Sequence, residues 1–351
     1  MEAVSKEMRI ESPRYAKVSH ASAMSLGLME GRMYRGAVNR CVNLLVHYPE
    51  GCSANCAYCG LAKKRPGTYE EKSFINVGWP VYSMDRIIEA INQAPAYVKR
   101  TCISMITNGK CRKHTLEMTR RLKDETRIPI SILISPTLLR EEDLVAMKEA
   151  GADKIGIAID LATPELFERY RGKGVSGPHK WERYWEILEL GLKIFGHPHV
   201  GAHLMVGMDE TEKEMVAIMD RLWRMGVYNH LFAFFAEKGS AMAERPQPPW
   251  PTYLRVQLAR FLIEEESVQM KDMAFDAEGH IIDFGLDPLR LREIIDRGTP
   301  FMTTGCLGED GKVACNRPFG NCLPDVKQWN YPYEPNEEEL ALIREHIFRV
   351  S

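Results

Sequence analysis

The sequence of 351 residues lacks several features that would assign its class at once. No apolar run reaches about 18 residues, the length that a membrane-spanning helix needs, so we expect no contact with a membrane. The first residues contain no apolar segment of the kind that directs secretion, and we expect a cytoplasmic protein. The formal net charge is only −2, which gives no support for binding nucleic acid through bulk electrostatics.

Cysteine is absent between Cys111 and Cys306, although the chain contains nine cysteines. The cytosol keeps thiols reduced, so these cysteines are not a disulfide framework. Most of them fall into two close triplets, which begin at Cys52 and at Cys306. The spacing within each triplet is therefore more informative than the total.

Between the triplets, residues 39–236 have the pattern of alternating strands and helices. We expect strands at 41–47, 102–106, 128–134, 154–159, 199–206 and 230–235, and helices at 83–94, 113–125, 141–150, 164–170, 180–192 and 211–225. The strands are rich in Ile, Val and Leu and rarely alternate with polar residues, which is typical of strands buried on both faces. Six such units favour an α/β fold with a partial or complete TIM-like β/α barrel, with a doubly wound open sheet as the alternative.

The composition changes after the last of these strands. Four prolines between positions 246 and 251 predict a rigid extended link around Trp250, followed by helices at 253–265, 288–297 and 337–348. We therefore divide the chain into an N-terminal helical extension (1–38), the barrel (39–236) and a C-terminal extension (237–351).

The first triplet, Cys52, Cys56 and Cys59, has the spacing C-x3-C-x2-C. It follows the first strand and would lie at the carboxyl end of the barrel, where such folds place their active sites. Three thiolates are an incomplete set for a structural zinc, which would need a distant fourth ligand. They suit a [4Fe–4S] cluster that leaves one iron open for another ligand.

With Tyr58 directly before the third cysteine, this motif resembles the signature of the radical S-adenosylmethionine (SAM) enzymes. The resemblance implies that Cys52, Cys56 and Cys59 hold the catalytic cluster and that its open iron binds SAM. It further implies that the reduced cluster cleaves SAM to methionine and a 5′-deoxyadenosyl radical, which removes hydrogen from an unactivated carbon. Reduced ferredoxin or flavodoxin would supply the electron.

The same resemblance suggests further SAM-binding positions besides Tyr58. Thr107 and Asn108 follow the second strand, where the family binds the methionyl amino group. Asp160 stands where a polar side chain holds the ribose, although it could equally cap the next helix. The stretch 203–210, HLMVGMDE, partly matches the family motif G-x-I-x-G-x-x-E beside the adenine. His203 and Met205 are therefore candidate contacts, with an ordinary buried barrel histidine as the alternative for His203.

The second triplet is Cys306, Cys315 and Cys322, and an Asp-Gly pair at 310–311 lies midway between the first two. Asp-Gly favours a two-residue type I′ hairpin, which would set Cys306 directly opposite Cys315. The chain then turns back toward Cys322, so we expect three thiols to converge. A second iron–sulfur cluster, a zinc ion and a reducible disulfide are the three interpretations.

The sequence does not identify a fourth ligand for this second site. Cys41 begins the first strand, so it lies either at the opposite end of the barrel from the Cys52 loop or within reach of the C-terminal segment. We include it as a candidate ligand. We interpret Cys102 and Cys111 as buried or incidental thiols.

Two clusters in one radical enzyme suggest sulfur insertion, in which the second cluster donates sulfide to a carbon radical. Biotin synthase carries its donor cysteines on the barrel strands, and ordinary lipoyl synthase carries a donor triplet upstream of the radical motif. Neither pattern fits, because no cysteine lies between 111 and 306 and only Cys41 lies upstream. Residues 51–61 and 305–322 instead resemble the two-protein lipoyl synthases, which are biotin-synthase-like.

That resemblance implies insertion of one sulfur into an octanoyl chain on a lysine of a lipoyl carrier protein, with a sister radical SAM protein inserting the other. Residues 63–65, Lys-Lys-Arg, could meet an acidic carrier domain, or could simply be a solvated loop. The alternative is another radical SAM enzyme, such as a mutase or dehydrogenase, that uses the second cluster for electron transfer or substrate binding. A zinc or iron–sulfur scaffold without radical chemistry is the interpretation from a different class.

Overall fold

The computed structural model describes residues 9–349, and an eight-stranded sheet forms their centre. Its strands are β1 (Tyr15–Val18), β2 (Cys41–Val46), β3 (Val81–Ser83), β4 (Arg100–Ser104), β5 (Ile130–Ile134), β6 (Ala152–Asp160), β7 (Val200–Val206) and β8 (Tyr228–Ala233). They lie in the order β3-β1-β2-β4-β5-β6-β7-β8. Neighbours from β2 to β8 run parallel, whereas β1 pairs antiparallel with both β2 and β3.

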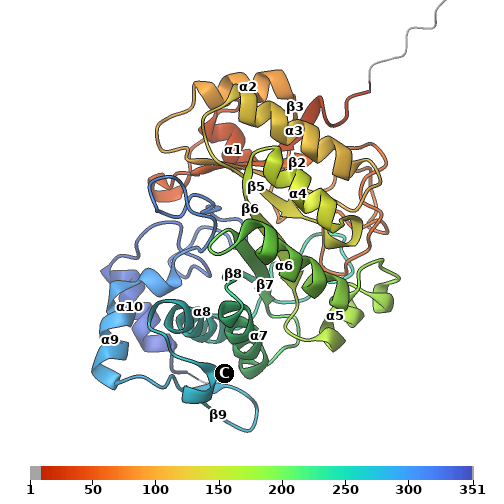
Figure 1. The fold of residues 1–351 in the computed structure, drawn as a ribbon. Coiled ribbons are helices and arrows are strands. Elements are labelled where there is room, and N and C mark those ends of the chain that lie inside the picture. Colours follow the sequence, from red (N-terminus) through yellow and green to blue (C-terminus); the bar gives the residue numbers. More distant parts are fainter. Residues whose placement is uncertain (1–8, 350–351) are drawn as a thin grey trace, which may run out of the picture.

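Helices connect the parallel strands and cover the outer side of the sheet (Figure 1). They are α2 (Met84–Asn92), α3 (Cys111–Glu125), α4 (Glu141–Glu149), α5 (Pro164–Tyr170), α6 (Trp181–Phe195) and α7 (Glu212–Arg224). The parallel strands follow one another in chain order, so right-handed crossovers place their helices on one side. A doubly wound sheet would reverse its strand order at one point. The parallel strands of the described sheet show no such reversal. The fold is thus an α/β fold with a partial barrel, open between β3 and β8.

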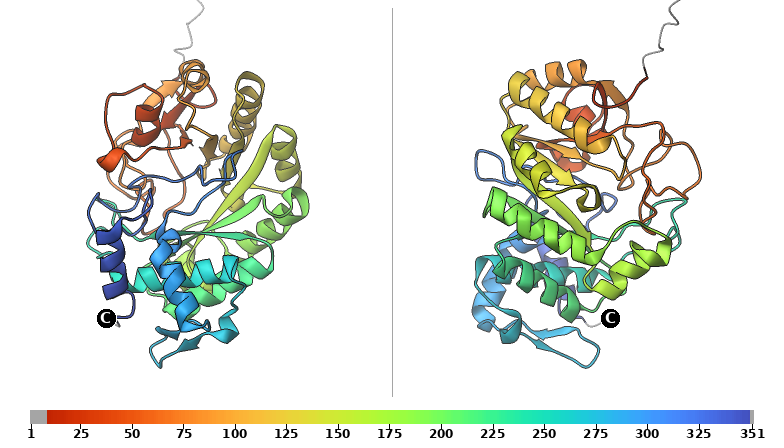
Figure 2. Two further views of the ribbon diagram at one scale, coloured as in Figure 1. Left: turned by 90° about the vertical axis from the view of Figure 1, so that its left-hand side faces the viewer. Right: turned by 45° about the vertical axis from the view of Figure 1, so that its right-hand side comes forward.

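The remaining elements lie before β2 and after β8. They are α1 (His20–Ser25), α8 (Trp250–Glu265), β9 (Ala274–Phe275), β10 (Ile281–Asp283), α9 (Pro288–Arg297) and α10 (Glu337–His346). In the left view of Figure 2, the blue segment after α9 crosses the side of the sheet opposite α4 and α6. No helix among residues 9–349 is long and apolar enough to cross a membrane.

Most predicted elements are confirmed, with small displacements. The helix predicted at 288–297 has those bounds, because the carboxylate of Asp287 accepts the free N–H groups of Leu289 and Arg290. The strand predicted at 102–106 lies instead at Arg100–Ser104. The apolar pattern missed its start because Arg100 is a buried charge, paired with Asp153.

Two other expectations need correction. The extended link predicted through 251 ends earlier, since Trp250 and Pro251 begin α8. Proline fits there because the first N–H groups of a helix have no partner within the helix. The N-terminal extension is not only helical: it contains α1, but β1 joins the central sheet. The division of the chain into three parts stays a prediction.

A buried ion pair fixes the C-terminal segment against the barrel. The carboxylate of Glu212, at the start of α7, accepts hydrogen bonds from Nε and Nη2 of Arg255 on α8 at 3.0 and 2.5 Å. It also accepts one from the backbone N–H of Ile281. The other guanidinium nitrogen, Nη1, donates to the carbonyl of Ile347 at 3.0 Å. The two side chains of this ion pair therefore tie α7, α8, β10 and the residues after α10 together.

Replacement Arg255→Leu is expected to lower the free energy of unfolding by about 3–5 kcal/mol, because it leaves a buried carboxylate without its partner. Replacement Lys193→Ala is the control, since it breaks only the exposed pair with Glu141 and should cost under about 1 kcal/mol. Urea unfolding measures both. If both variants lost the same small free energy of unfolding, the role of Arg255 in holding the C-terminal segment would be contradicted.

Candidate functional site

The first cysteine triplet lies on the loop after β2, at the carboxyl edge of the parallel strands. Cys52, Cys56 and Cys59 all line one cavity of about 240 Å³. The loop is held to the neighbouring strand because both the backbone N–H and the hydroxyl of Ser53 donate to the carbonyl of Thr107, at 2.7 and 2.8 Å. Three thiols thus face one space from one anchored loop, as the spacing predicted.

The interior position of these thiols sets their protonation. Burial raises the pKa of Cys56 to about 11. The pKa of Cys59 is also raised, mainly by burial and to a smaller extent by the neighbouring thiols of Cys56 and Cys52. Without a metal, Cys56 and Cys59 therefore hold their protons. A cationic cluster would supply the missing positive charge, and an iron–sulfur cluster fits the donor set.

Tyr58 and Asp160 meet at the cavity wall. The Tyr58 hydroxyl donates to Oδ2 of Asp160 at 2.6 Å, and Nη1 of Arg171 donates to the same oxygen at 2.5 Å. Arg171 also donates to the carbonyl of Ala158. Asp160 is not the cap of the following helix, because the Thr163 side chain accepts the N–H of Leu166.

Sequence reasoning missed Arg171. It lies just beyond α5, it is 8% exposed, and it lines the same cavity. No motif includes it, and its only signal in the sequence is a charge directly after an amphipathic helix. The fold makes it the counter-ion of Asp160.

The other predicted SAM-binding positions divide into two groups. Thr107, His203 and Met205 line the cavity, and the ring of His203 lies 5.0 Å from that of Phe232. Burial lowers the pKa of His203 well below its usual value, so the ring is neutral. Asn108 is not among the lining residues, because its side-chain amide donates to the carbonyl of Gly51 at 3.0 Å and so holds the cluster loop.

Gly207 and Glu210, the glycine and the glutamate of the motif at 203–210, shape the turn after β7. Gly207 has φ +104°, a conformation that favours glycine. Its N–H and that of Met208 both donate to the Glu210 carboxylate at 2.7 Å. Burial raises the pKa of Glu210 to about 7. This pair thus determines where the chain leaves β7 rather than contacting the cavity.

The second triplet does not converge as expected. The hairpin exists, but Leu307 pairs with Val313 and the Gly308 N–H donates to the carbonyl of Lys312, so the loop is one residue longer than a type I′ turn. Only Gly311 in this loop has positive φ, whereas type I′ requires two such residues. The register is therefore shifted by one from the prediction.

Within this hairpin, Cys306 and Cys315 stay close, since the Cys315 N–H donates to the Cys306 carbonyl at 3.1 Å. Cys41 lies beside them: hydrogen bonding with Cys41 lowers the pKa of Cys315. Cys322 is elsewhere, with its thiol donating to Oε1 of Gln328 at 3.2 Å. Whether each of these thiols binds metal stays a prediction.

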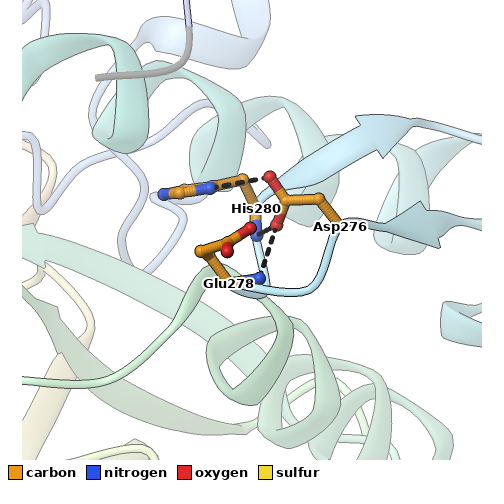
Figure 3. Close-up of side chains that lie close together, drawn as sticks. All are labelled: Asp276, Glu278 and His280. Atoms are coloured by element: carbon orange, nitrogen blue, oxygen red, sulfur yellow. Dashed lines mark hydrogen bonds and ion pairs between the residues drawn. The ribbon is translucent and has the colours of Figure 1, made fainter.

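One exposed group of ligand-type side chains comes from the β9–β10 hairpin. Asp276, Glu278 and His280 place one ligand atom each within 4.8 Å of one another (Figure 3). The Asp276 carboxylate is already used, because it accepts the N–H groups of Glu278 and His280 and the ring of His280. This arrangement is a turn stabilised by its own aspartate and gives no reason to assign a metal.

Comparison with known proteins identifies the class. A family model described as the radical SAM superfamily matches residues 46–222, half of the chain, and the chain belongs to this superfamily. The biotin synthase of Aquifex aeolicus (strain VF5) is 25% identical over 168 residues, which are 47% of this chain and 46% of that protein. The match thus spans about half the length of the curated relative.

Two solved structures also share part of their fold with this chain. Methylornithine synthase has 12% identity and a TM-score of 0.48, covering 78% of this chain and 85% of that one. The FeFe-hydrogenase maturase HydG from Carboxydothermus hydrogenoformans has 15% identity and a TM-score of 0.47, covering 70% and 55%. Superfamily membership implies a [4Fe–4S] cluster and SAM, and the cavity lined by the three thiols fits them.

Replacement Arg171→Met is expected to weaken SAM binding by at least about tenfold, which corresponds to 1.4 kcal/mol. The reason is that it leaves the partly buried Asp160 carboxylate without its counter-ion and frees the Tyr58–Asp160 pair from its position at the cavity wall. Equilibrium dialysis of the reconstituted protein with SAM measures the affinity.

Arg169→Met is the matched control, because its side chain is 62% exposed and pairs only at the surface with Asp209. The two variants should differ. If the Arg171→Met protein bound SAM as tightly as the control, Asp160 and Arg171 would not belong to the SAM-binding site.

Proposed function

We propose that this protein is a radical SAM sulfurtransferase that inserts sulfur into the octanoyl chain of a lipoyl carrier protein, with a second [4Fe–4S] cluster as the sulfur donor. One observation carries the proposal. A single cavity is lined by Cys52, Cys56 and Cys59 at one end and by Cys102 and Cys315 at the other. A substrate in this cavity can face both groups of thiols.

The length of the barrel supports this arrangement. β2 runs from Cys41 to Val46, and a strand rises about 3.3 Å per residue, so its ends lie about 16 Å apart. The first triplet follows the carboxyl end of β2, and Cys315 lies near its amino end. This separation leaves room for an alkyl chain between the two groups.

The cavity wall is suited to such a chain. Its apolar lining includes Leu45, Leu133, Phe232 and Phe234. These side chains exclude water and can bury the methylene groups of an acyl chain. When bound, SAM and the two clusters supply a radical that removes hydrogen from a carbon and a sulfide that bonds to that carbon, leaving one electron on the cluster iron.

The loop after the first triplet supports a carrier protein as partner. Lys63 and Lys64 are exposed, whereas Arg65 is turned inward and donates to the carbonyl of Gly60 at 2.6 Å. The two lysines thus present positive charge close to the cluster loop, where an acidic carrier domain could dock. A sister radical SAM protein and reduced ferredoxin or flavodoxin complete the proposed set of partners.

The test is an anaerobic assay with SAM, dithionite and an octanoylated carrier domain. The wild-type protein is expected to form 5′-deoxyadenosine together with a carrier that gains the mass of sulfur. Cys315→Ala is expected to keep SAM cleavage but lose sulfur insertion, because only the donor side of the cavity is changed. Mass spectrometry reads both products.

Cys111→Ala is the matched control, since Cys111 is a buried thiol on α3 outside both triplets. It should retain sulfur insertion. A carrier that is dehydrogenated or rearranged without gaining sulfur would reject the proposal in favour of a mutase or dehydrogenase that uses the second cluster to transfer electrons.

A further inference from the structure

Two cysteines on neighbouring strands point into the barrel near the amino end of its strands. In the parallel pairing of β2 and β4, Asn43 lies opposite Cys102. Asn43, Leu45 and Cys102 all line the cavity. Alternate residues of a strand share a face, so Cys41 points inward with Asn43 and Leu45. The barrel therefore supplies two inward thiols, Cys41 and Cys102, at the amino end of its strands.

The C-terminal hairpin brings two more thiols to the same end. Nε of Arg100, the first residue of β4, donates to the carbonyl of Leu307 at 2.8 Å. The backbone N–H of Arg40, just before β2, donates to the side-chain oxygen of Asn316 at 3.0 Å. These contacts hold the residues next to Cys306 and Cys315 against the starts of β4 and β2.

The side-chain contacts place the thiols together. Nδ2 of Asn43 lies 3.7 Å from the sulfur of Cys41 and 3.8 Å from the sulfur of Cys315. Burial and, after it, the thiols of Cys315 and Cys306 raise the pKa of Cys102, which lies opposite Asn43 in the sheet. All four cysteines are free. Asn43 thus donates toward two sulfurs that belong to segments far apart in the sequence.

Cys322 does not belong to this group. Its thiol donates to Gln328, and the shift in its pKa comes from burial and from the backbone of residues 329 and 330, with no contribution from another thiol. The three-residue set Cys306, Cys315 and Cys322 is therefore not the one that the fold assembles.

The spacing of the thiols indicates the size of the group they would bind. Sulfurs around a zinc ion lie about 3.8 Å apart, as follows from tetrahedral bonds of about 2.3 Å. No three of the nine thiols, all of which lie in the described residues, are within 4.8 Å of one another. This spacing favours a multi-iron cluster, whose thiolates bind different irons, over a single zinc ion.

Positive charge surrounds the four thiols. Arg100 and Arg317 act on Cys315, and Arg100 and Lys154 act on Cys306. Within the described residues, Nη1 of Arg317 is buried and makes no hydrogen bond. Four thiolates on a [4Fe–4S] cluster leave net negative charge, which these cations would balance.

We propose that Cys41, Cys102, Cys306 and Cys315 are the ligands of the second iron–sulfur cluster, and that Cys322 is not. Four protein thiolates leave no open iron, so this cluster donates sulfide or electrons and does not bind substrate through iron. The assignment deepens the proposed function and rests on it only for the presence of a second cluster.

The test removes the first cluster so that the second is measured alone. The full chain with Cys52→Ala, Cys56→Ala and Cys59→Ala is reconstituted anaerobically, and iron, zinc and acid-labile sulfide are measured. About four irons per chain are expected. Adding Cys41→Ala and Cys102→Ala together leaves only two of the four thiolates, fewer than the three that hold the first cluster, and is expected to lower iron below about one per chain.

Cys322→Ala and Cys111→Ala, each added to the same triple variant, are the matched controls. Both proteins should retain the full iron content. Melting temperatures of the metal-free variants show whether each one folds. Full iron in the protein that carries both Cys41→Ala and Cys102→Ala, loss of iron with Cys322→Ala, or zinc in place of iron would each overturn the assignment. Retained iron without sulfur insertion by the wild-type enzyme would instead reject the proposed function and leave the ligand set intact.

Discussion

The buried guanidinium of Arg100 joins the barrel to the C-terminal segment. Its Nη atoms donate to both carboxylate oxygens of Asp153 at 2.5 and 2.7 Å, and its Nε donates to the carbonyl of Leu307. A buried charge is stable only when it is paired and hydrogen-bonded. The segment carrying Cys306 is therefore held at the amino end of the strands. The wall of the cavity at that end depends on the contact between Arg100 and Leu307.

The same cavity explains why the barrel is only partial. A closed barrel packs its centre with side chains, as layers of Val, Ile and Leu. Here polar side chains and thiols replace part of that filling, and Asn43, Ser104 and Cys102 line open space. The C-terminal segment then passes beside β8, where the Leu231 N–H donates to the Thr304 hydroxyl. An element outside the barrel thus completes its interior.

Local patterns predicted much of the fold and one end of the site. The C-x3-C-x2-C spacing placed three thiols on one loop, and apolar runs located six parallel strands within a few residues. The positions of Arg171 and Cys102 at the cavity escaped prediction because they arise only when segments distant in the sequence become neighbours. The Asp310–Gly311 turn was predicted in the wrong register because Asp310 pairs with Arg40 across the molecule, a contact that local turn preferences do not include.

In the proposed reaction, sulfur from the protein's own second cluster reaches the substrate. The most direct measurement reconstitutes the enzyme with heavy-isotope sulfide, removes the excess and runs a single turnover with an octanoylated carrier in unlabelled buffer. If the cluster is the donor, the sulfur bound to the carrier is expected to be the heavy isotope. A product that contains only light sulfur, or none, would contradict it.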